Sequence, residues 1–95
     1  MNPLRVALLQ ILPQGSLEKN LKKGIKACEE AKKAGADIAL FPEMWSSGYD
    51  MPKDPEEMRK KSVPADSDFV LAFGKLAAQL EMAIAITFLE RYEPF

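Results

Sequence analysis

Histidine is absent from the sequence, and cysteine occurs once, as Cys28. Without histidine a Ser-His-Asp catalytic triad is impossible, and a conventional zinc site is not expected, because its ligands are mostly histidine and cysteine. A single cysteine also excludes an internal disulfide, which fits a reducing compartment. We therefore expect no metal, no cofactor and a cytoplasmic location.

Long apolar runs and an excess of one charge are also absent. No run approaches the ~20 residues that a membrane-spanning helix needs, and residues 1–5 lack the apolar core of a signal peptide. The 13 basic and 14 acidic residues leave a net charge of -1, so neither nucleic acid nor a membrane is an expected partner. No glycine-rich phosphate-binding motif occurs.

Three short apolar runs alternate with segments of helical periodicity. Residues 5–12, 37–41 and 82–89 have the composition of strands covered on both faces. Ser16 is expected to cap the first long helix, and Gly35 to end it. The apolar stripe of this helix comprises Leu17, Leu21, Ile25, Cys28 and Ala31.

A loop rich in proline, glycine and charge, residues 46–64, separates the second strand from the second long helix. Residues 55–61 are expected to form a short helix within it, and Asp66 or Ser67 to cap the long helix. The buried side of that helix is predicted to comprise Phe69, Val70, Phe73, Leu76, Ala77 and Leu80. The order strand-helix-strand-loop-helix-strand predicts an α/β fold with parallel strands.

Glu43 is the leading candidate for a functional residue. It directly follows Pro42, which ends the second strand, and ligands of open α/β sheets bind outside the carboxyl ends of the strands. A charge at the end of a buried strand is costly unless it is paired or used. Position alone leaves an alternative open, a surface glutamate in a first turn where negative charge is mildly favourable.

Three further residues have two interpretations each. Trp45 and Tyr49 follow Glu43 closely and are candidates for the wall of a substrate pocket, or for aromatic cover at the edge of the core. Cys28 is either a nucleophile or a small buried residue of the first helix. We prefer the second, because its end of the helix lies away from the carboxyl ends of the strands.

Seven segments along the chain match a known family in order and spacing. They are residues 6–10, Asn20, residues 35–37, 40–45, 47–49 and 83–86, and Glu90. Through them the chain resembles the N-terminal portion of the nitrilase, or carbon-nitrogen hydrolase, superfamily. The resemblance implies an α-β-β-α sandwich and a cysteine-dependent amidohydrolase with a Glu-Lys-Cys triad.

In this resemblance Glu43 corresponds to the general base and Glu90 to a supporting glutamate. The base activates a cysteine thiol, which attacks an amide, carbamoyl or nitrile carbon of a small substrate, while the lysine stabilises the oxyanion. The lysine and the cysteine have no match here. Residues 1–95 are therefore expected to be the N-terminal fragment of one such domain, inactive alone, from a parent that forms homo-oligomers.

A different class of function remains open. Two helices can cover one face of a three-stranded sheet, whereas all three strands are apolar on both faces. The chain is then either a piece of a larger domain or a non-catalytic α/β module that associates with another chain, through the uncovered face or the edge strand at residues 82–89.

Overall fold

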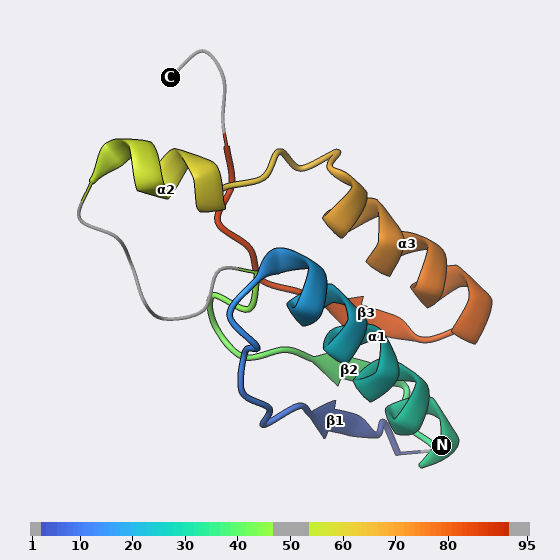
Figure 1. The fold of residues 1–95 in the computed structure, drawn as a ribbon. Helices are drawn as coiled ribbons and strands as arrows, with labels where there is room; N and C mark the ends of the chain where they lie inside the picture. Colours follow the sequence, from blue (N-terminus) through green and yellow to red (C-terminus); the bar gives the residue numbers. More distant parts are fainter. Residues whose placement is uncertain (1–2, 47–53, 92–95) are drawn as a thin grey trace.

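The computed structural model describes residues 3–46 and 54–91. Within these ranges the chain forms three strands and three helices in the predicted order (Figure 1). They are β1 (Val6–Leu8), α1 (Leu17–Lys33), β2 (Ile38–Leu40), α2 (Pro55–Lys61), α3 (Asp68–Leu80) and β3 (Ala83–Ala85). The predicted α/β class is confirmed, and the arrangement is consistent with part of a nitrilase-type sandwich.

The three strands form one parallel sheet in the order β1-β2-β3, so β2 is central. Ala39 of β2 pairs with Ala7 on one side and with Ile84 on the other. The helices α1 and α3 lie on the same face of the sheet (Figure 1). The hydrophobic core lies between this face and the two helices.

The strands are shorter than the apolar runs that predicted them. The ladder between β1 and β2 extends only to the bond from Leu9 N to Leu40 O, 2.9 Å long. On the other side Phe41 N donates to Ala85 O at 3.0 Å, and Pro42, which has no N–H, follows. Beyond Ala85 the chain bonds instead to the turn after Pro42, so its apolar residues are not ladder residues.

The second face of the sheet is open in the part of the chain that the structure describes. Val6, Leu8 and Leu40 point to this face and are 47%, 64% and 40% exposed. Their neighbours Ala7 and Ala39 on the helix-covered face are half-buried and buried. The expectation that two helices cover only one face is therefore met.

Helix α1 has the predicted boundaries. The Ser16 side chain accepts a hydrogen bond from Lys19 N at 3.2 Å, as an N-cap does. Gly35, just after the helix, has φ 91°, the left-handed conformation that ends many helices. The buried face of α1 consists of Asn20, Gly24, Cys28 and Ala31. It is thus rotated from the predicted stripe towards small and polar residues, because α1 lies very close to the chain that follows β2.

Gly24 marks this close approach. A Cβ atom placed on Gly24 would lie 2.8 Å from Phe73 Cζ and 3.0 Å from both Phe41 Cε1 and Trp45 Nε1. The three rings form one cluster, with centroids 5.2 Å apart for Phe41 and Phe73 and 5.5 Å apart for Phe41 and Trp45. Only a residue without a side chain allows α1 to reach this aromatic cluster.

The other two helices also begin as predicted. Ser67, one of the two predicted caps, accepts a hydrogen bond from Val70 N at 3.3 Å and opens α3. Asp54 caps α2 in the same way, with Pro55 in the first turn. No helix in the described residues is long and apolar enough to cross a membrane.

Cys28 lies in the core with no exposed surface. Burial, and to a lesser degree the negative charge of Glu29, raise the pKa of its thiol from 9.0 to about 11. A thiol in this environment stays protonated at neutral pH and is a poor nucleophile.

We expect Gly24→Ala to destabilise the fold by about 1–3 kcal/mol, the usual cost of overpacking a core. The matched control is Gly74→Ala in α3, because nothing lies within 4 Å of a Cβ atom there. Gly74→Ala should stabilise by about 0.5–1 kcal/mol through helix propensity. Urea unfolding measures both changes, and a Gly24→Ala variant as stable as the unmodified chain would contradict the close packing.

We also expect Cys28 to make stability depend on alkaline pH. Its folded-state pKa, about 11, lies above the unfolded value of 9.0, so the protonated thiol favours folding below pH 9. This contribution is lost as the pH rises through 11. The free energy of unfolding should therefore fall more steeply between pH 9 and 11 for the unmodified chain than for Cys28→Ala. Because both chains carry the same other titratable groups, the difference between the two slopes reports Cys28 alone. Equal slopes would show that the thiol is not buried.

Candidate functional site

Glu43 follows the central strand at its carboxyl end, as predicted. Its side chain is exposed, and it belongs to a turn, residues 42–46, that we call the Glu43 turn. The neighbouring strand β3 ends at the same edge of the sheet, since Leu40 pairs with Ala85. A carboxylate at this edge can accept a proton from a group that is bound there.

Thr87 holds the Glu43 turn from the side of β3. Its hydroxyl donates to Pro42 O at 2.6 Å and accepts from Trp45 N at 2.8 Å. Its carbonyl accepts from Ser46 N at 3.3 Å, and Ser46 Oγ in turn accepts from Leu89 N at 3.0 Å. These bonds replace the sheet ladder, which ends at Pro42.

Asn20 holds the same turn from the side of α1. Its side chain is 1% exposed, and its amide nitrogen donates to Trp45 O and Ser46 O, both at 3.2 Å. The amide oxygen accepts from Gln14 N in the loop before α1. The buried amide is thus fully used, and it ties the Glu43 turn to two other segments of the chain.

Trp45 is part of the core in this structure. Its side chain is 1% exposed and packs against Phe41 and Gly24. The indole Nε1 is buried, and within the described residues it has no hydrogen-bond acceptor. Of the two roles considered for Trp45, cover for the core is the one that this packing supports. Tyr49, the other candidate wall residue, lies outside the described residues.

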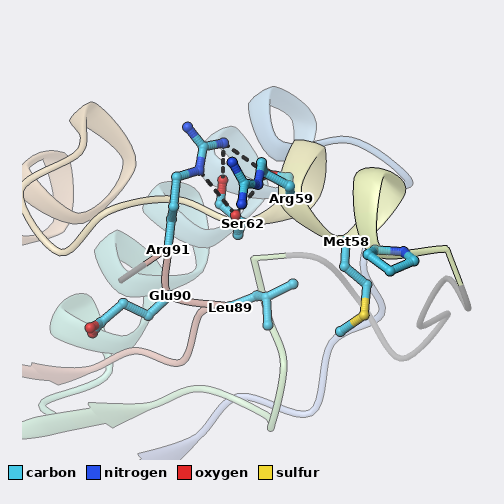
Figure 2. Close-up of a pocket in the computed structure, with 7 residues that line it drawn as sticks. Met58, Arg59, Ser62, Leu89, Glu90 and Arg91 are labelled. Atoms are coloured by element: carbon cyan, nitrogen blue, oxygen red, sulfur yellow. Dashed lines mark hydrogen bonds between the residues drawn. The ribbon is translucent and has the colours of Figure 1, made fainter. Parts of the chain in front are cut away.

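Glu90 lies on residues 86–91, which we call the extension of β3, beside the segment that follows α2. Val63 N donates to Leu89 O and Arg91 N donates to Val63 O, both at 2.8 Å, so a short parallel bridge encloses Glu90. The Glu90 side chain is exposed and extends away from the Arg91 guanidinium (Figure 2). Glu43 therefore follows β2, and Glu90 lies on the segment that continues β3, the strand adjacent to β2.

Arg91 fastens the end of α2 to this extension. Its guanidinium donates to Arg59 O at 2.8 Å, to Ser62 O at 3.1 Å and to Ser62 Oγ at 3.2 Å (Figure 2). A cation that bonds the last carbonyls of a helix is a favourable C-terminal contact. The shallow hollow between α2 and the extension has a volume of about 290 Å³. It is lined by Pro55, Met58, Arg59, Ser62, Leu89, Glu90 and Arg91.

The chemistry available at this edge is that of a carboxylate base. The described residues contain no group of three or more His, Cys, Asp and Glu side chains that could hold a metal ion. Cys28 is buried in the second half of α1, whereas the Glu43 turn contacts the first turn through Asn20. Cys28 is thus a core residue, as we preferred from the sequence.

Sequence reasoning missed Thr87 and gave Asn20 and Gly24 no structural role. Asn20 is a polar residue between Leu17 and Leu21 of the predicted apolar stripe of α1. A glycine inside a helical pattern, such as Gly24, often marks a close packing contact. Both were signals that could have been used. Thr87 had no such signal, because a threonine in an apolar strand is ordinary.

Comparison with known proteins identifies the family. The family model described as carbon-nitrogen hydrolase matches residues 5–94. A glutamine-dependent NAD(+) synthetase of Thermotoga maritima is 31% identical over 94 residues, which is 98% of this chain. The chain spans only 16% of the length of that relative. With the family model matching nearly every residue, the chain belongs to the carbon-nitrogen hydrolase family.

Proposed function

We propose that residues 1–95 are the N-terminal part of a single carbon-nitrogen hydrolase domain, which cleaves non-peptide carbon-nitrogen bonds with a Glu-Lys-Cys triad. Glu43 is the general base of that triad. The observation that carries this proposal is the position of Glu43: an exposed carboxylate follows the central strand, in a turn held by Asn20 and Thr87. Family membership supports the same role.

In the proposed reaction, the Glu43 carboxylate takes the proton of a cysteine thiol, and the thiolate attacks the carbonyl carbon of an amide. A carbon-sulfur bond forms, the carbon-nitrogen bond breaks, and the proton held by Glu43 leaves with the nitrogen as ammonia. Glu43 then takes a proton from water, which attacks the thioester. The products are a carboxylic acid and the regenerated thiol.

The lysine stabilises the oxyanion that forms in each step, and Glu90 supports the centre from the adjacent strand. The nucleophile and the lysine come from residues outside this chain. Two observations favour this: the Cys28 thiol has no exposed surface and a raised pKa, and the sheet has an open apolar face, where Leu8 is 64% exposed. A second layer of the same domain would cover that face.

A primary amide is the first substrate class to test. The Thermotoga maritima relative is named for its dependence on glutamine, and the glutamine side chain ends in a primary amide. Carbamoyl compounds and nitriles are the other two classes. The hydrolysis of all three can release ammonia, so one assay covers them. A cytoplasmic location stays a prediction from the sequence, and homo-oligomers of the full-length protein stay a prediction from the family resemblance.

A second candidate function, a non-catalytic module that associates with another chain, is favoured by the same open face. The two functions differ in what covers Val6, Leu8 and Leu40. A second layer of the same domain covers them in the first, and a separate chain covers them in the second. The activity experiment below separates these cases, because only the first function predicts ammonia release that depends on Glu43.

In the full-length protein we expect Glu43→Gln to lower kcat by about 10²–10⁴-fold, the usual contribution of a general base. The amide keeps the size of the side chain and removes its basicity. Ammonia release is measured from L-glutamine, butyramide, N-carbamoyl-β-alanine and butyronitrile. The matched control is Glu30→Gln, the same change at an exposed position of α1, which should leave kcat unchanged.

The 95-residue chain should release no ammonia from any of these compounds. Turnover by this chain that survives both Glu43→Gln and Cys28→Ser would refute the assignment of the base. Wild-type turnover by the full-length Glu43→Gln variant would refute it as well.

We expect the isolated 95-residue chain to self-associate in sedimentation velocity experiments, because its open face exposes large apolar side chains. Leu8→Lys on that face should shift the population towards monomer. Leu71→Lys is the matched control, since Leu71 is 50% exposed on α3, away from the sheet. A monomer with cooperative unfolding at all concentrations would argue against both the fragment assignment and an association function.

A further inference from the structure

We propose that Thr87 is a positioning residue for Glu43, and that its side-chain hydroxyl sets the conformation of the turn that carries the catalytic base. This inference rests on the proposed role of Glu43. The residue comes from the chain that continues β3, far from Glu43 in sequence. No motif of the sequence marks it.

The hydroxyl occupies the central hydrogen-bonding position of the turn. In a closed β-turn the carbonyl of the first residue accepts from the N–H of the fourth, here Pro42 and Trp45. Instead, Thr87 Oγ1 accepts from Trp45 N at 2.8 Å and donates to Pro42 O at 2.6 Å. A hydroxyl suits this place, because it is both a donor and an acceptor. Glu43 and Met44 thus lie in a loop that Thr87 closes.

The backbone inside this loop is strained. Met44, the residue after Glu43, has φ 57°, a left-handed conformation that non-glycine residues seldom adopt. Such a conformation persists where its surroundings impose it, and these sites concentrate near functional residues. Here the hydroxyl bridge on one side and the bonds from Asn20 to Trp45 O and Ser46 O on the other impose it.

The same contact couples the two candidate carboxylates. Thr87 lies three residues before Glu90 on one continuous segment, and Ser46 bonds to that segment at Thr87 O and Leu89 N. The direction of Glu43 relative to Glu90 therefore depends on these two bonds and on those of the Thr87 hydroxyl, since the backbone ladder between β2 and β3 has already ended. Without the hydroxyl, Pro42 O and Trp45 N lose their shared partner, and the strained turn is free to relax.

Two substitutions separate a positioning role from simple packing. Thr87→Val keeps the shape and loses the hydroxyl, whereas Thr87→Ser keeps the hydroxyl and loses the methyl group. Both are made in the full-length protein, and ammonia release is measured with whichever of the four test compounds the unmodified protein turns over fastest. Leu76→Ala, which removes a buried side chain of α3, is the control for loss of stability alone.

We expect Thr87→Val to lower kcat by about 10–100-fold, as small misplacements of a catalytic group do, with little change in KM. Thr87→Ser should retain most of the kcat, and Leu76→Ala should retain kcat in the folded fraction despite its lower stability. Amide hydrogen exchange at Trp45 gives a readout that needs no activity. The amide should be protected in the unmodified protein and in Thr87→Ser, and exchange faster in Thr87→Val.

Wild-type kcat in Thr87→Val, or equal loss in Thr87→Ser and Thr87→Val, would overturn the positioning role. If Glu43→Gln is inactive while Thr87→Val has wild-type kcat, only this inference fails. If Glu43→Gln keeps full activity, the proposed function fails, and the role of Thr87 fails with it.

Discussion

The contact between Gly24 of α1 and the aromatic cluster of Phe41, Trp45 and Phe73 is the constraint on which the rest of the structure depends. Any side chain at Gly24 would place its Cβ atom within about 3 Å of Phe73, Phe41 and Trp45, as close as 2.8 Å for the first. Because the helix lies this close, the Trp45 ring is buried. The Glu43 turn, which contains Trp45, is therefore held at the carboxyl edge of the sheet, with the Glu43 side chain exposed.

Hydrogen bonds from polar side chains hold the Glu43 turn in addition to this packing. Pro42 ends the ladder of β2, so the backbone groups of the Glu43 turn need partners from outside the sheet. Asn20 and Thr87 supply them from two different directions, and both are themselves fully used in these bonds. Hydrogen bonds of this kind in a partly buried place restrict the turn, as the proposed role of Glu43 as a base requires.

Much of the local structure could be predicted from the sequence. The caps at Ser16 and Ser67, the stop at Gly35 and the short helix α2 depend on side chains close to the backbone groups that they satisfy. The lengths of the strands could not be predicted, because a run of apolar residues shows burial and not ladder bonding. The role of Trp45 could not be decided either, since an aromatic residue suits both a pocket and a core.

The sequence by itself determined the order of the helices and strands, their caps and the place of Glu43 directly after a buried strand. Each of these follows from interactions between residues a few positions apart. Only the tertiary structure decided that Trp45 is buried and that the Thr87 hydroxyl closes the Glu43 turn. The bonds of Thr87 to Trp45 and Pro42 span 42 and 45 residues, so they exist only once β3 lies beside β2. Local patterns carry no information about such pairings.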